Sequence, residues 1–332
     1  MENVAIQPGD EVLYPSPGYP IYESQIEFHG GKALPYGYLE GGDNFRMDFE
    51  SIERQITPRT RLLVFNDLQN PTGAECSAGE RERIAELVLS HDLYVLCDEA
   101  YFDIRYSGTR VSLASLPGMA ERCVILYSFS KKFAMTGWRL GAAIGPRQII
   151  EVIAKLNVNN ESCANHFIRY GVLAGLGGDQ RGPRRILEIL RERRDAAVGI
   201  LNSIWGVRCF SPNATGAMRK RGTTDYNAFR RTMLEETGVS FCTRLHFGRP
   251  LPGEREFYVR FAYSGIETPM IREGLGRARV YGGASRPSRR GLASISPTRR
   301  RSSAGWNGLP MNGSVEPATP KWMVGSSVYP DM

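Results

Sequence analysis

The first 145 residues alternate short apolar runs with stretches whose apolar positions recur at helical spacing. These runs are almost continuously apolar, which is typical of strands buried on both faces of a parallel sheet. The pattern predicts an α/β fold with a mostly parallel sheet covered by helices, and such sheets bind ligands at the carboxyl ends of their strands. The predicted strands cover residues 11–14, 61–66, 93–97, 123–127 and 140–144.

Helix signals lie between these strands and after them. Ser77 and Glu80 have the spacing of a capping box, which predicts a helix from Ser77 to about Ser90. A second, amphipathic helix is predicted from Gly182 to about Ile204, and shorter α and β elements follow it as far as Ile266. We therefore expect a large domain, a smaller α+β C-terminal domain and a disordered tail, over residues 1–190, 191–276 and 277–332.

The expected tail differs from the rest of the chain in composition and charge. Residues 285–313 are rich in Arg, Ser, Pro and Gly without an apolar period, which predicts disorder. The chain has a net charge of +7, but nine of its 42 basic and two of its 35 acidic residues lie from Arg277 onward. Residues 1–276 therefore carry 33 charges of each sign. Such a balance argues against a nucleic-acid partner, and the arginine clusters of the tail are the alternative site for one.

Several other classes of protein are disfavoured by composition. No apolar run approaches the roughly 18–20 residues that a membrane helix needs, and the N-terminus lacks the pattern of a secretory signal. The six cysteines form no CxxC pair, so neither a zinc ribbon nor a redox motif is expected. No Gly-x-Gly-x-x-Gly follows a predicted strand, which argues against a nicotinamide-dependent enzyme. We expect a cytoplasmic protein with reduced thiols.

Polar residues of complementary chemistry follow the predicted strands. Asn70 lies in an Asn-Pro-Thr-Gly turn after the second strand, and Asp98 and Tyr101 follow the third. A carboxylate buried at a strand end needs a partner, because an unpaired buried charge is costly. For Asp98, a cationic ring nitrogen and a structural arginine are both suitable partners.

The segment 128–141 is the richest in such groups. Ser128 and Arg139 supply a hydroxyl and a guanidinium that suit a phosphate dianion. Lys131 lies between them and can form a Schiff base with a carbonyl cofactor, with Lys132 as the adjacent alternative. A reactive lysine and an acidic partner for a pyridinium nitrogen are what a protein contributes to pyridoxal phosphate chemistry.

Five segments of the chain resemble those of the class I/II aminotransferases, which are fold type I enzymes that depend on pyridoxal 5′-phosphate. The resemblance covers roughly residues 8–276, and its most specific part is the block Ser-x-Ser-Lys…Gly-Trp-Arg-x-Gly. It implies transfer of an amino group from an amino acid to a 2-oxo acid by a homodimer. The segments are PGDEVLYPSPGYPIYES (8–24), NPTG (70–73), DEAY (98–101), SFSKKFAMTGWRLG (128–141) and YVRFAYSG (258–265).

The resemblance implies a role toward the cofactor for each matching residue. Lys131, which directly follows Ser-x-Ser, would form the Schiff base and move the proton at the substrate Cα. Asp98 would keep the pyridine nitrogen protonated. Asn70 and Tyr101 would donate hydrogen bonds to the phenolic oxygen of the cofactor.

Further matches imply contacts with the ring, the phosphate and the substrate. Tyr19 would stack on the pyridine face, with a place in the core as the alternative. Ser128 and Arg139 would bind the phosphate. Arg260 would clamp the substrate α-carboxylate beside Asn70, and a surface arginine is the alternative for Arg260. For His246, a place at the substrate mouth and a purely structural role both stay open.

Three departures from the family pattern modify this expectation. Family members carry a segment before the stretch that begins at Pro8, including a helix N-terminus that binds phosphate, so we expect the large domain to be incomplete. Residues 213–222 lack the apolar strand of the family, and the tail does not resemble its closing helix. The alternatives are a catalytically impaired remnant that binds pyridoxal phosphate weakly or not at all, a lyase of the same fold, and a regulatory binding module.

Overall fold

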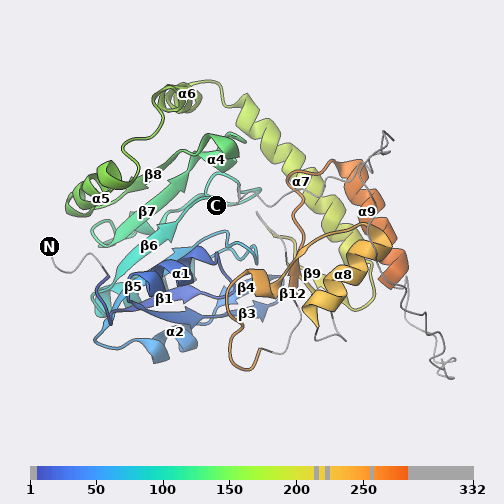
Figure 1. Ribbon diagram of the computed structural model, residues 1–332, viewed down its shortest axis with the longest axis horizontal. Helices are drawn as coiled ribbons and strands as arrows, with labels where there is room; N and C mark the ends of the chain where they lie inside the picture. The colour runs from blue at the N-terminus through green and yellow to red at the C-terminus, as the bar shows by residue number, and fades with distance from the viewer. Residues whose placement is uncertain (1–5, 213–216, 221–224, 255–257, 283–332) are drawn as a thin grey trace, which may run out of the picture.

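The computed structural model describes residues 6–212, 217–220, 225–254 and 258–282 (Figure 1). Its centre is a six-stranded sheet in the order β2-β1-β5-β6-β7-β8, in which only the pair β7 and β8 is antiparallel. The predicted fold class is confirmed, and each predicted strand matches an observed one to within one residue at either end. The strands are β1 (Glu11–Pro15), β2 (Lys32–Tyr36), β5 (Thr60–Asn66), β6 (Tyr94–Asp98), β7 (Cys123–Ser128) and β8 (Gly141–Ile144).

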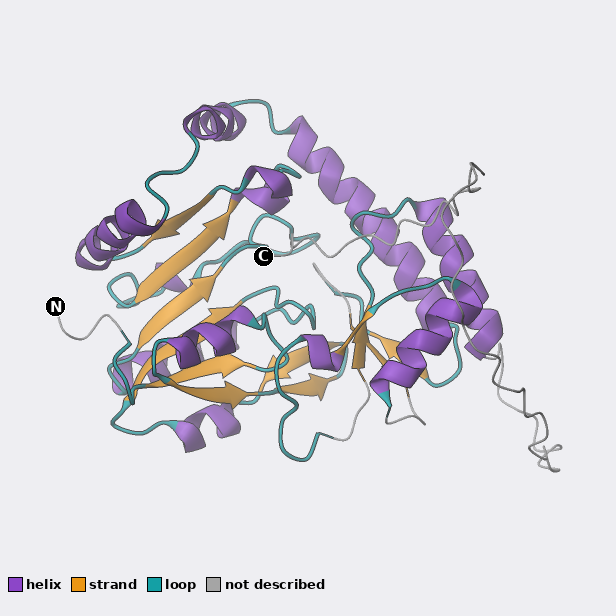
Figure 2. Cartoon of the chain, in the orientation of Figure 1, coloured by secondary structure: helices purple, strands orange, loops and turns teal. Residues whose placement is uncertain are grey.

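Helices cover both faces of this sheet (Figure 2). Successive residues of a strand point to opposite faces, so each face has its own core. Leu13 and Leu63 pack with α2 and α3 on one face, whereas Val12 and Val64 pack with α1 on the other. The helices of this part are α1 (Ile21–Phe28), α2 (Phe49–Gln55), α3 (Ala78–Ser90), α4 (Phe129–Lys132), α5 (Arg147–Asn160) and α6 (His166–Gly177).

The capping box predicted at the start of α3 is present. The Ser77 hydroxyl accepts from the Glu80 backbone N–H at 3.2 Å, and the Glu80 carboxylate accepts from the Ser77 N–H at 2.9 Å. The sequence did not predict a short antiparallel ribbon or two single 3₁₀ turns nearby. These are β3 (Tyr38–Gly41), β4 (Asn44–Met47), η1 (Leu113–Ser115) and η2 (Thr136–Trp138).

A second core lies under a four-stranded antiparallel sheet of order β11-β12-β10-β9. Within residues 213–222, where the sequence lacks the apolar strand of the family, residues 217–220 form a short strand. Their backbone pairs with β9 on one side and β12 on the other, so neighbouring strands supply the order that the local sequence does not. The elements are α7 (Arg181–Asn202), β9 (Val207–Cys209), β10 (Ala217–Lys220), α8 (Tyr226–Thr237), β11 (Cys242–Thr243), η3 (Arg244–His246), β12 (Tyr258–Arg260) and α9 (Thr268–Gly282).

We refer to residues 6–180 as the large unit and to residues 181–282 as the small unit. Helix α7 is continuous across residue 190, and Leu190 packs against the second core. Helix α9 continues past residue 276 to Gly282, because Ala278 is buried in the same core. The segment 283–332, where the sequence predicts disorder, lies outside the described residues. No helix of the described ranges is both long and apolar enough to span a bilayer.

Candidate active site

The carboxyl ends of three neighbouring strands meet at one edge of the large sheet. In the register of the parallel strands, Asn66 at the end of β5 lies beside Asp98 at the end of β6. The Asn66 side chain donates to the Asp98 backbone carbonyl at 2.9 Å and accepts from the Asn70 N–H at 3.1 Å. Strand β7 ends next to them at Ser128, which caps α4. The fold therefore brings the predicted residues of three loops to one place.

Asp98 is held by one donor on each carboxylate oxygen. The Tyr22 hydroxyl donates to Oδ2, and the Ala100 N–H donates to Oδ1 at 3.0 Å. Burial raises the pKa of Asp98, whereas these two hydrogen bonds and the positive charge of Lys131 act in the opposite direction. The described residues thus give Asp98 a tyrosine and a backbone amide as hydrogen-bond partners, and the arginine that the sequence left open is not among them.

Lys131 and Lys132 have different surroundings. The Lys131 ammonium lies 5.5 Å from the centre of the Tyr101 ring. Burial, followed by the positive charges of Arg260 and Arg139, lowers the pKa of Lys131 to about 8. Lys132 instead forms an ion pair with Asp103 at 3.5 Å. Lys131 is therefore the lysine that shares its electrostatic environment with the other candidate residues.

Arg260 reaches from the small unit to the large one. Its Nη1 donates to Asn70 Oδ1 at 2.7 Å, Nη2 lies 3.8 Å from the sulfur of Cys242, and its Cζ lies 4.8 Å from the centre of the Phe247 ring. Its Nε is buried and has no hydrogen-bond partner among the described residues. Arg260 is therefore not a surface arginine, and its buried Nε–H can donate a hydrogen bond to a ligand. Burial raises the pKa of the neighbouring Tyr101 to about 12, against the effect of the Arg260 charge.

The remaining predicted residues lie around this centre. The Tyr19 ring packs edge-on against Tyr22, with ring centres 5.7 Å apart. The Ser128 hydroxyl accepts from the Ser130 N–H at 3.3 Å. Arg139 has a left-handed backbone with φ of 55° and is exposed, and its Nη1 donates to the Thr136 carbonyl at 3.0 Å. Its charge nevertheless acts on Lys131, as described above.

His246 has a structural position. It is exposed, and its Nδ1 accepts from the Thr243 N–H at 3.1 Å, which caps the turn η3. This contact accounts for the residue without a ligand. In the described part of the chain, no three His, Cys, Asp or Glu side chains gather in a way that could hold a metal ion.

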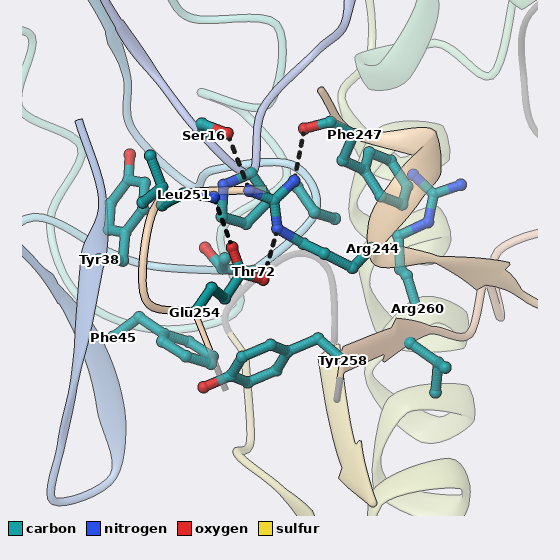
Figure 3. Close-up of a pocket in the computed structure, with 13 residues that line it drawn as sticks. Ser16, Tyr38, Phe45, Thr72, Arg244, Phe247, Leu251, Glu254, Tyr258 and Arg260 are labelled. Carbon is teal, nitrogen blue, oxygen red and sulfur yellow. Dashed lines mark hydrogen bonds and ion pairs between the residues drawn. The ribbon is translucent and has the colours of Figure 1, made fainter. Parts of the chain in front are cut away.

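A cavity of about 210 Å³ lies beside Arg260, between the β3–β4 ribbon and the small unit (Figure 3). Aromatic side chains form much of its wall, including Tyr38, Phe45 and Tyr258. Arg244 lines the same cavity but is only 2% exposed. The guanidinium of Arg244 donates to five oxygens, namely Glu254 Oε1 (2.8 Å), the carbonyls of Phe247 (3.1 Å), Gly248 (3.1 Å) and Arg249 (3.0 Å), and Ser16 Oγ (2.9 Å).

Sequence reasoning missed Tyr22 and Arg244. Tyr22 lies on the first turn of α1, and Tyr19 precedes this helix by two residues. No local pattern marks Tyr22, because its partner Asp98 lies 76 residues later in the chain. Arg244 is a charged residue directly before the exposed Leu245 and His246, and its own side chain gives no sign of burial in the sequence.

Comparison with known proteins adds an independent finding. The sequence model of the family aminotransferase class I and II matches residues 2–277. An aspartate aminotransferase of Musicola paradisiaca is 34% identical over 271 residues, which cover 80% of this chain and 66% of that protein. The aromatic-amino-acid aminotransferase 2 of Thermococcus litoralis is 33% identical over 267 residues, or 78% and 67% of the two chains. The chain thus spans about two thirds of the length of these curated relatives.

Solved structures agree with this similarity. The crystal structure of an aromatic aminotransferase from Pyrococcus horikoshii superposes with a TM-score of 0.78 at 31% identity, covering 84% of this chain and 74% of that one. An aspartate aminotransferase from Rhizobium meliloti superposes with a TM-score of 0.75 at 29% identity, covering 83% and 71%.

Proposed function

Because the chain belongs to the aminotransferase class I and II family, we propose that it moves an amino group from an amino acid to a 2-oxo acid with pyridoxal 5′-phosphate. The observation that carries the proposal is one juxtaposition. Lys131 shares a partly buried site with Asp98. The charge of Arg260 also acts on Lys131, and the buried Nε of Arg260 has no partner among the described residues. Together these groups supply a nucleophile, an anion for a ring nitrogen and a cation for a carboxylate.

The described residues fit this cofactor. Each oxygen of Asp98 already accepts one hydrogen bond, and a carboxylate oxygen has room for a second, so a ring N–H can be bound. Asn70 and Tyr101 would hold the phenolic oxygen, and Tyr19 would lie against the ring. Ser128 and Arg139 would hold the phosphate. When bound, pyridoxal 5′-phosphate withdraws electrons from the substrate Cα.

Lys131 supplies the base for this chemistry. With a pKa of about 8, roughly a tenth of its amine is neutral at pH 7, whereas an ordinary lysine is almost entirely protonated there. The neutral Nζ is the nucleophile that would hold the carbonyl cofactor, and the same amine would accept the proton that leaves the substrate Cα. The same residue returns this proton when the reaction runs toward the amino acid.

Arg260 binds and orients the substrate. Its planar guanidinium is suited to a carboxylate, and the free Nε offers a donor that no described protein group uses. Asn70 Oδ1 fixes the guanidinium through Nη1 at 2.7 Å, so the clamp is oriented before substrate arrives. Amino acids and 2-oxo acids both carry the carboxylate that Arg260 recognises.

Two other parts of the proposal rest on the family alone. We propose a cytoplasmic homodimer, which light scattering of the purified chain and fractionation of cells would test. The proteins similar to this chain are aminotransferases, so the impaired remnant and the lyase are not favoured over amino transfer.

The test is the near-ultraviolet and visible spectrum of the purified chain with pyridoxal 5′-phosphate, before and after addition of an amino acid. We expect a yellow band that requires Lys131 and bleaches with the amino acid. Lys131→Ala removes the nucleophile, and Lys132→Ala is the matched control because Lys132 pairs with Asp103 instead. A band that survives Lys131→Ala, or that fails to form at all, would contradict the proposal.

A further inference from the structure

We propose that Tyr22 is a positioning residue for Asp98, and that its hydroxyl holds the carboxylate in the orientation that binds the ring nitrogen of the cofactor. This inference rests on the proposed function. The observation behind it is the hydrogen bond from the Tyr22 hydroxyl to Asp98 Oδ2, opposite the Ala100 N–H on Oδ1. The carboxylate is thereby fixed from both sides.

The position of Tyr22 is itself fixed by packing. The side chain is 7% exposed and belongs to the core between α1 and the sheet, together with Tyr14 and Ile26. Its ring also packs edge-on against Tyr19. The hydroxyl cannot leave Asp98 without opening this core. Helix α1 therefore delivers one rigid donor to the carboxyl end of β6.

The need for such a donor follows from burial. Burial disfavours the charged form of a carboxylate, and it raises the pKa of Asp98. A protonated carboxyl no longer offers its charge to a pyridinium nitrogen. Hydrogen bonds to the ionised form oppose this, and Tyr22 supplies the one that comes from a side chain. Tyr22 thus acts on the cofactor only through Asp98.

This mode of action suggests a test with two cofactors. The affinities of the cofactor-free protein for pyridoxal 5′-phosphate and for its analogue with C–H in place of the ring nitrogen are measured by equilibrium dialysis. In Tyr22→Phe we expect pyridoxal 5′-phosphate to bind about tenfold more weakly, and the analogue to bind as in the original protein. Both cofactors meet the same folded fraction, so their ratio stays meaningful if the variant is less stable.

Tyr14→Phe is the matched control. Tyr14 is 3% exposed in the same core, and its hydroxyl bonds Glu23, a carboxylate outside the site. We expect this variant to leave the ratio of the two affinities unchanged. Equal weakening of both cofactors in Tyr22→Phe would overturn the inference, because Tyr22 would then act through packing. Unchanged or tighter binding of pyridoxal 5′-phosphate would overturn it as well.

A second measurement uses Asp98→Asn, in which the charged acceptor is absent. In this background Tyr22→Phe should change the affinity for pyridoxal 5′-phosphate by less than twofold, since the two residues act in series. A further tenfold loss would show that Tyr22 acts independently of Asp98. If the original protein fails to bind pyridoxal 5′-phosphate through Lys131, the proposed function fails, and that result comes from a different arm of the experiment.

Discussion

Arg244 and Arg260 lie in adjacent segments of the small unit, line the same cavity and contact the large unit, yet they are engaged in different ways (Figure 3). All five N–H groups of Arg244 donate to protein oxygens, including Ser16 of the large unit. Arg260 donates to Asn70 and leaves a buried Nε without a partner among the described residues. Arg244, whose N–H groups all have protein acceptors, joins the two units. Arg260, which has an N–H group without a protein acceptor, is available to a ligand.

The energetic reason lies in the cost of an unmade hydrogen bond. A buried donor without a partner costs about 1–3 kcal/mol, and a ligand that supplies the acceptor recovers this amount. For Arg244 the protein has already supplied every acceptor, so a ligand gains nothing there. The comparison teaches that buried charge marks a binding site only where its hydrogen bonds are incomplete.

The largest expected effect is on stability, in Arg244→Met. The change leaves Glu254 without its cation and removes one hydrogen-bond donor from each of three backbone carbonyls. Removing one partner of a buried pair costs about 3–5 kcal/mol, so we expect the free energy of unfolding to fall by that amount. Urea titration followed by circular dichroism measures it. A stable Arg244→Met with weakened substrate binding would reverse the roles of the two arginines.

Arg260→Met should have the opposite signature. It removes the orphaned Nε and also the donor to the buried Asn70 Oδ1, and because these two effects oppose each other we expect little change in the urea midpoint. Truncating a buried charge that binds a charged ligand costs about 2–5 kcal/mol, which corresponds to a loss of about 30- to 5,000-fold in kcat/KM for the amino acid. Steady-state kinetics with the loaded enzyme checks this. Unchanged kcat/KM would mean that the substrate carboxylate lies elsewhere.

Glu254→Gln tests the structural role of Arg244 with a smaller expected effect on stability. The glutamine can still accept from Arg244 Nε, but the hydrogen bond loses its charge on one side. Hydrogen bonds with a charged partner exceed neutral ones by about 1 kcal/mol, and we expect a stability loss of that size. The affinity for amino acid should not move, because Arg260 makes no contact with Glu254 in the described structure. A loss of binding free energy for the amino acid that exceeds the loss of unfolding free energy would contradict this.

The smallest effect concerns the pH dependence of Lys131. Its neutral fraction increases as the pH passes its pKa of about 8, so covalent capture of the cofactor should become faster through that range. The positive charge of Arg260 contributes to the lowered pKa. In Arg260→Met the midpoint should therefore move to higher pH, whereas Glu254→Gln should leave it in place. Borohydride trapping at a series of pH values gives the midpoint, and a shift to lower pH would refute the assignment.

Much of the fold could be predicted because its strands are short and almost entirely apolar. The strand 61–66 carries Leu63 and Val64, which enter opposite cores, and such double burial leaves a visible run in the sequence. Strand β10 could not be predicted in this way, since its order comes from pairing with β9 and β12. Strand β2 lies at the edge of the sheet and contains Pro35, which weakens its sequence signal.

The candidate site shows the same division. Asp98 and Lys131 could be located because Asp98 ends β6 and Lys131 comes three residues after the end of β7, and neighbouring parallel strands end at one edge. Tyr22 could not, because its partner lies 76 residues later and their contact depends on how α1 packs on the sheet. Arg244 could not either, because only the tertiary structure supplies the carbonyls around its guanidinium. Contacts between distant segments are what local patterns omit.

The division of the site between two units has a consequence for synthesis. Arg260 is made 129 residues after Lys131. At about 5–20 residues per second, a ribosome needs about 6–26 s to cover that distance. During this interval the nascent chain already carries Asp98 and Lys131 but not the arginine that would recognise a substrate. The ribosome therefore synthesises the half of the site suited to the cofactor before the half suited to the amino acid.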